Sequence, residues 1–195
     1  MPVHVRELGI DLLSIAGHKL YAPKGVGALY VRRGAPLLPF ALGAGHERGL
    51  RPGTENVAAI VGLGVACRRA QQDVDVEAAR VQQLRDRPWE RLRADVPGIQ
   101  LNGHPVLRLP NTLNVRFPGV SGPAVLVAAT RVAASTGSAC HDGQEQASGV
   151  VLAMGVPVAE ALGSVRLTLG RHTTLAEVEE AVDSLARAWR ASRQE

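Results

Sequence analysis

The hydrophobic and polar positions of this chain form short stretches of strand and helix periodicity. Apolar runs at 12–15 and 28–31, separated by turn residues, predict two short strands joined by a glycine-bracketed turn. Apolar and polar residues alternate over 113–117 and again over 165–169, which predicts two half-buried strands. A shorter apolar piece at 99–101 precedes a turn dipeptide and predicts one more strand.

The segment after Thr54 carries apolar residues at the three- and four-residue spacing of a helix. Thr54 or Asn56 can cap its amino end. Gly62 and Gly64 lack side chains and would allow another segment to pack closely. Cys67 lies among apolar residues of this helix, which favours an unreactive core thiol. We expect the helix to bury one apolar face, formed by Val57, Ile60, Val61 and Val65.

Further helices are predicted later in the chain. One over 76–94 should kink or restart at Pro88, because a proline inside a helix costs roughly 3 kcal/mol. Short aliphatic helices are expected at 123–132 and 150–154. The last helix opens with the capping box Thr174–Glu177. Its buried face should consist of Val178, Val182, Leu185 and Trp189.

Composition narrows the class of protein. Hydrophobic residues make up 46% of the 195 residues and charged residues 21%, which is typical of a soluble globular chain. The net charge is +4, but the arginines are dispersed and no basic run alternates with aromatic residues, so we expect no direct nucleic-acid binding. No run reaches membrane-spanning length and no signal peptide is evident, which favours a cytoplasmic location without membrane contact. Cys67 and Cys140 are too few for a disulfide framework, and we assign no metal ligands.

Three residues carry candidate chemistry. Lys19 follows His18 in the first predicted turn, and a partly desolvated lysine at the mouth of two strands can form a Schiff base. Cys140 lies beside a histidine in a loop of small residues, where a thiolate nucleophile would be accessible. Arg166 should point away from the core and offers a planar fork that matches a carboxylate. From the residues alone, a surface lysine, an ordinary loop thiol and a surface arginine are the commoner explanations.

Four segments stand out by their composition and order: Gly17–Gly27, Gly45–Asn56, Ser135–Cys140 and Ser164–Arg171. Together they resemble segments of cysteine desulfurases, in the class V aminotransferase family. The first is similar to the lysine segment that binds pyridoxal phosphate, and the second to the stretch after the lysine hairpin. The third is similar to the nucleophile loop, in the form of the branch that serves iron–sulfur cluster assembly and tRNA thiolation. The fourth is similar to the strand that binds the substrate carboxylate.

The resemblance implies a pyridoxal 5'-phosphate enzyme that takes sulfur from L-cysteine, leaving L-alanine and a persulfide on Cys140. It implies that Lys19 holds the cofactor covalently and that His18 and Thr54 contact the cofactor phosphate. It assigns Arg166 to the α-carboxylate of the substrate. The implied partners are a sulfur-acceptor or scaffold protein and, in the full-length family, a second copy in a homodimer.

The resemblance covers only the C-terminal portion of the family's aspartate aminotransferase-like fold. We therefore expect residues 1–72 to be a remnant of the large cofactor domain and 73–195 to be the small C-terminal α/β domain with the cysteine loop. The family's ring-stacking histidine and ring-pairing aspartate come from the upstream part, so this chain alone should be inactive. Its first strands should then show unpaired edges and an exposed apolar face. Ala16 and Pro52 replace two usual serines, each weakening phosphate anchoring by about 1 kcal/mol or more.

Two alternatives stay open. The chain could be a non-catalytic interaction module in which Cys140 at most carries sulfur delivered by another enzyme. It could also resemble a lyase of the same family that acts on selenocysteine, although the nucleophile loop favours sulfur. Release of sulfide from L-cysteine separates the enzyme from the module.

Overall fold

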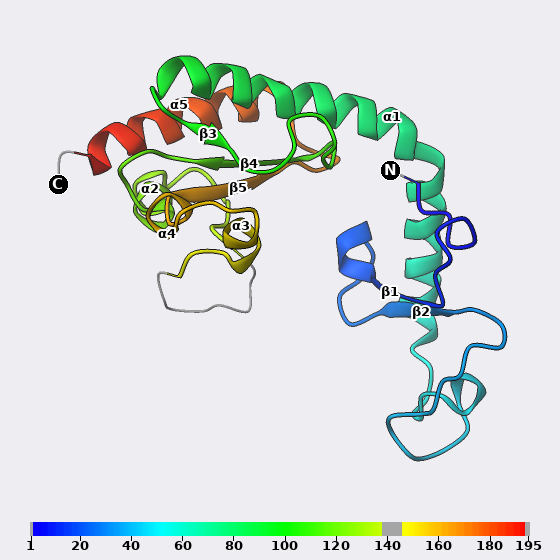
Figure 1. Ribbon diagram of the computed structural model, residues 1–195. Helices are drawn as coiled ribbons and strands as arrows, with labels where there is room; N and C mark the ends of the chain where they lie inside the picture. Colours follow the sequence, from blue (N-terminus) through cyan, green and yellow to red (C-terminus); the bar gives the residue numbers. More distant parts are fainter. Residues whose placement is uncertain (1, 138–145, 194–195) are drawn as a thin grey trace. The chain divides into compact units, whose positions relative to one another are not determined.

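The structure is a computed structural model that describes residues 2–137 and 146–193 (Figure 1). The chain divides into two compact units, Met1–Asp75 and Val76–Glu195, each of which is described by itself. Helix α1 (Val57–Asp95) begins in the first unit and ends in the second. The division between the units therefore falls inside α1.

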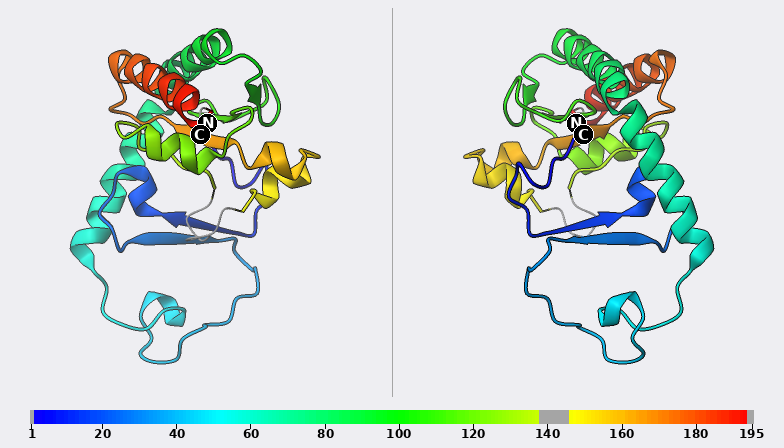
Figure 2. Two further views of the ribbon diagram at one scale, coloured as in Figure 1. Left: turned by 90° about the vertical axis from the view of Figure 1, so that its left-hand side faces the viewer. Right: turned by 90° about the vertical axis from the view of Figure 1, so that its right-hand side faces the viewer.

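An antiparallel hairpin organises the first unit. It pairs β1 (Leu12–Ala16) with β2 (Gly27–Val31), and the 3-10 turn η1 (Gly17–Leu20) fills part of the connection. The predicted strand, turn and strand are confirmed. A long loop with the 3-10 turn η2 (Glu47–Gly49) leads from β2 to α1 (Figure 2). Among the described residues no third strand joins this sheet, so one edge of each strand is unpaired.

Helix α1 is one continuous helix of 39 residues, so the prediction of a second helix beginning near residue 76 is wrong. Asn56 caps its amino end, because the backbone N–H of Ala59 donates to Asn56 Oδ1 at 3.1 Å. Pro88 lies inside the helix without ending it. Leu92 and Val96 follow it and are completely buried in the core of the second unit. Packing there compensates for the backbone bond that the proline cannot make.

The predicted apolar face of α1 is not buried in this structure. Three of its four residues are more than half exposed: Val57, Val61 and Val65. The buried positions are instead Ala59, Leu63 and Ala66. Cys67 is half-buried and not a core thiol. The periodicity thus predicted a helix correctly, but it did not identify the side against which the rest of the unit packs.

The second unit is built on a three-stranded antiparallel sheet. Its strands β3 (Gln100–Leu101), β4 (Thr112–Arg116) and β5 (Ser164–Thr168) lie in the order β3-β4-β5. The C-terminal part of α1 and helix α5 (Leu175–Ser192) run along one side of this sheet (Figure 1). The core between them is aliphatic, with Phe117 and Trp189 as the aromatic members of its buried cluster.

Shorter helices complete the second unit: α2 (Gly122–Ala128), α3 (Gly149–Ala153) and α4 (Val158–Ala161). Helix α5 begins at the predicted capping box. The backbone N–H of Glu177 donates to Thr174 Oγ1 at 3.3 Å, and the backbone N–H of Thr174 donates to Glu177 Oε2 at 2.8 Å. Two helix-end donors are thereby satisfied, and the predicted start of the last helix is confirmed.

Candidate functional site

The lysine turn is held closed at its base by glycine. The backbone N–H of Gly17 donates to the carbonyl of Val26 at 3.0 Å. A Cβ atom added at Gly17 would lie 2.6 Å from that same oxygen, so only glycine fits here. Tyr21 ends the 3-10 turn in the left-handed conformation, with φ of 64°. His18 and Lys19 therefore lie on a short turn whose two ends are fixed by backbone contacts.

Lys19 and His18 are both exposed. Lys19 makes no ion pair with another described residue. The described part of this chain therefore does not supply the partial desolvation that we expected for Lys19. Thr54, in the loop before α1, is also exposed, and the helix cap is Asn56. The hydroxyl of Thr54 is thus not engaged as a helix cap, which leaves it available to a ligand.

Arg166 lies in the middle of β5 between two other segments of backbone. It is paired with Asn114 of β4 on one side and with Ser135 on the other. The N–H of Arg166 donates to the carbonyl of Ser135 at 2.7 Å. Its neighbours Val165 and Leu167 are buried, whereas Arg166 is half-buried. Its side chain therefore points away from the core, as predicted from the alternation.

Two arginines share this face of the sheet, and they differ in what they bind. Arg116 donates to Asn102 Oδ1 at 2.5 Å and to Gln100 Oε1 at 2.6 Å, and it lies 3.5 Å from Glu160. Arg166 makes no side-chain hydrogen bond or ion pair with another described residue. A half-buried guanidinium with unused donors is suited to an anionic ligand.

The segment that leads to Cys140 starts beside Arg166. Ser135 Oγ accepts a hydrogen bond from the N–H of Gly137 at 3.2 Å and donates one to its carbonyl at 2.7 Å. This local turn and the bridge to β5 fix the beginning of the nucleophile-like segment at the edge of the sheet. Cys140 itself lies outside the described residues, so its predicted place in the site is not tested.

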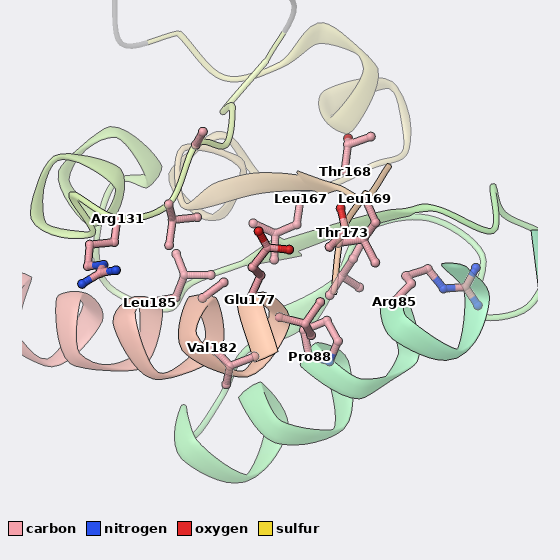
Figure 3. Close-up of a pocket in the computed structure, with 15 residues that line it drawn as sticks. Arg85, Pro88, Arg131, Leu167, Thr168, Leu169, Thr173, Glu177, Val182 and Leu185 are labelled. Carbon is pink, nitrogen blue, oxygen red and sulfur yellow. The ribbon is translucent and has the colours of Figure 1, made fainter. Parts of the chain in front are cut away.

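A hollow of about 160 Å³ opens on the other side of the same sheet (Figure 3). Leu113, Leu167 and Val182 are among its apolar lining. Arg85 lines it too, but its guanidinium points away from the other lining side chains and donates to the carbonyl of Leu109 at 2.8 Å and to the carboxylate of Asp86 at 2.9 Å (Figure 3). Strand alternation places the side chain of Arg166 on the opposite face. The hollow is therefore not the candidate site.

The candidate residues fall into two groups, one in each unit. Lys19, His18 and Thr54 belong to the first unit, and Arg166 belongs to the second. The alternation of residues 113–117 showed that Asn114 faces away from the core, but only the strand register shows that it lies opposite Arg166. Among the described residues, no group of three or more histidine, cysteine, aspartate or glutamate side chains could hold a metal ion.

Solved structures with the same fold define the class of protein. A NifS-like protein superimposes with a TM-score of 0.85 and 31% sequence identity over 96% of this chain and 48% of its own. A NifS-like protein from Rickettsia africae gives a TM-score of 0.87 at 26% identity. The fold is thus part of the mixed α/β fold of NifS-like proteins, as predicted.

Sequence comparison leads to the family. The model of the family "Aminotransferase class-V" matches residues 1–181, and the chain belongs to this family. It is 45% identical over 185 residues to a cysteine desulfurase of Gluconacetobacter diazotrophicus, covering 94% of this chain. It is also 45% identical over 184 residues to the cysteine desulfurase NifS of Azotobacter vinelandii. In both cases the match covers 46% of the relative, so the chain spans about half the length of these proteins.

None of the helices in the described part of the chain is both long and apolar enough to cross a membrane.

Proposed function

We propose that this chain carries part of the active site of a cysteine desulfurase. The observation that carries the proposal is the half-buried side chain of Arg166 beside Ser135, whose guanidinium has no partner among the described residues. The segment toward Cys140 begins at Ser135. Cys140 follows Ser135 by five positions in the sequence, and five residues of chain reach at most about 18 Å. A guanidinium that can bind a carboxylate and a thiol on a nearby segment of chain suit a substrate that has both a carboxylate and a sulfur atom.

The residues of the first unit fit pyridoxal phosphate as the cofactor. Lys19 offers an exposed amine on a turn with fixed ends, and the neighbouring His18 and the available hydroxyl of Thr54 would contact the cofactor phosphate. Ala16 and Pro52 offer no side-chain hydroxyl for this purpose. When bound, the cofactor would act as an electron sink for the substrate carbon next to the amine.

The proposed reaction gives each of these residues of the chain a role. Arg166 holds the α-carboxylate of L-cysteine in paired hydrogen bonds. Lys19 takes the proton from the α-carbon and returns a proton to the product. The thiolate of Cys140 attacks the substrate sulfur, so that a sulfur–sulfur bond forms while the carbon–sulfur bond breaks. The products are L-alanine and a persulfide on Cys140, which a sulfur-acceptor protein would then consume.

We further propose that residues 1–72 belong to the large cofactor domain and 73–195 to the small domain, in the C-terminal half of the family's fold. The exposed surfaces of the first unit support this division. Leu12 and Leu29 of the hairpin are 45% and 52% exposed, beside strand edges that lack partners among the described residues. Additional polypeptide covering these surfaces would complete the fold, so these 195 residues alone should not turn over L-cysteine.

Two measurements test the proposal. Addition of pyridoxal phosphate should produce a new absorbance band in the wild-type chain and none in Lys19→Ala; identical spectra would refute the role of Lys19. Sulfide release from L-cysteine, measured with a thiol reductant that reduces the persulfide, should require an added N-terminal half of a related desulfurase and should be lost in Cys140→Ser. Release that persists in Cys140→Ser would refute the persulfide step.

A second candidate function is an interaction or sulfur-carrier module. The exposed hairpin and the exposed face of α1 favour it, because both are surfaces on which another chain could pack. The module would release no sulfide even with the added half, but Cys140 would still accept sulfur from a persulfide donor. Supplying selenocysteine in place of L-cysteine in the same assay distinguishes a selenocysteine lyase-like enzyme from a cysteine desulfurase. The cytoplasmic location and the homodimer stay predictions.

A further inference from the structure

Asn114, the residue directly opposite Arg166, also has polar side-chain atoms that can bind a ligand. Asn114 is the partner of Arg166 across β4 and β5, and paired residues of antiparallel strands point to one face with their Cβ atoms about 5 Å apart. The neighbour on the other side, Ser135, uses its hydroxyl for both backbone groups of Gly137. Of the two cross-strand neighbours of Arg166, Asn114 is therefore the one whose side chain can serve a ligand.

A hydrogen bond from Asn102 fixes the orientation of the side-chain amide of Asn114. Asn102 Nδ2 donates to Asn114 Oδ1 at 2.9 Å and to Ser164 Oγ at 3.0 Å. Asn102 is only 7% exposed, and its own Oδ1 accepts from Arg116, so it cannot turn over without breaking these bonds. The oxygen of Asn114 is thus committed to Asn102. Its Nδ2 donates to no other described residue.

We propose that Asn114 is a second hydrogen-bond donor in the carboxylate site of Arg166, an inference that rests on the proposed function of that arginine. The guanidinium supplies two parallel N–H bonds to a carboxylate, and Asn114 Nδ2 adds a neutral donor from the neighbouring strand. Asn102 is a positioning residue, because it acts by orienting the amide of Asn114. The ligand class is an amino acid with a free α-carboxylate.

The test is a titration of the complete 195-residue chain, followed by the backbone amide NMR signal of Ser135, which lies beside residue 166 and is present in every variant. The probes are L-alanine, which has the carboxylate, and L-alaninamide, which does not. L-Alanine should shift the signal saturably and L-alaninamide should not. Asn114→Leu should raise the dissociation constant for L-alanine about ten-fold, the size of one hydrogen bond to a charged group. Asn114→Asp keeps the shape but adds a repelling carboxylate, so it should weaken binding further.

Thr112→Val is the matched control. Thr112 lies on the same strand and face but opposite Thr168, so its replacement should leave the dissociation constant unchanged. Comparison of backbone amide spectra will show whether Asn114→Leu folds; if it does not, Asn114→Ala, which removes the amide without adding a charge, takes its place. Unchanged binding in the folded Asn114 variant, with binding lost in Arg166→Leu, overturns this inference and leaves the proposed function standing. Unchanged binding in Arg166→Leu as well, or no saturable shift in the wild-type chain, overturns both.

Discussion

Alanine substitution at two nearby glycines of α1 should disturb the lysine turn in one case and leave it unchanged in the other. Gly62 and Gly64 are both interior residues of this helix. An added Cβ at Gly62 would lie 3.0 Å from Cδ and 3.1 Å from Cγ of Pro23, whereas one at Gly64 would meet nothing within 4 Å. Pro23 belongs to the connection between Lys19 and β2. Gly62 is therefore a point at which α1 supports the lysine turn, and Gly64 is a matched control.

The magnitudes follow from two opposing contributions. Alanine is favoured over glycine inside a helix by about 1 kcal/mol, and both substitutions gain this amount. Only Gly62→Ala also forces the proline ring to move, and such overpacking typically costs about 1–3 kcal/mol. Gly64→Ala should therefore stabilise the chain by about 1 kcal/mol, and Gly62→Ala should be about 1–3 kcal/mol less stable than Gly64→Ala.

Hydrogen exchange of the hairpin amides is the direct assay, because it reports the free energy of local opening. The N–H of Gly17 is the best single reporter, since its bond to Val26 closes the turn. We expect faster exchange at this amide in Gly62→Ala than in the Gly64→Ala control. Equal protection of the hairpin in the two variants would show that α1 does not support the turn through Gly62.

Three further changes test the second unit. Thr174→Ala removes the cap on the N–H of Glu177 and should lower the free energy of unfolding in urea by about 1 kcal/mol, while Thr174→Ser should retain most of it; equal stability of the alanine and serine variants would contradict the capping box. The hydrogen bond from Arg87 lowers the pKa of Glu179 from its ordinary 4.5. The carboxylate of Glu179 therefore stabilises the fold above that value, and this stabilisation is lost as the pH falls through the folded-state pKa. Stability curves against pH should thus be shallower below pH 4.5 for Glu179→Gln than for wild type, and identical slopes would exclude this contribution. Trp189→Phe removes a 3.0 Å indole N–H bond to a backbone carbonyl and should cost about 1 kcal/mol in thermal unfolding; an unchanged melting temperature would argue against that bond.

Local patterns of the sequence determined the elements that depend on near neighbours. The alternation around Val165 and Leu167 predicted β5 and the outward direction of Arg166. Thr174 and Glu177 predicted the start of α5, because a capping box involves residues only three apart. The turn that carries Lys19 was predicted from apolar runs and glycines for the same reason. These features need no knowledge of what packs against them.

Only the tertiary structure decided which surfaces are buried and which residues meet across the sheet. The side of α1 that contains Val61 fits a buried stripe, but burial depends on a partner, and the described first unit packs on the side of Leu63 instead. Pro88 can remain inside a helix because distant residues bury the turns that follow it. The pairing of Asn114 with Arg166 depends on strand register, which joins residues far apart in the chain. Periodicity gives each element its own faces, and contacts between distant elements choose among them.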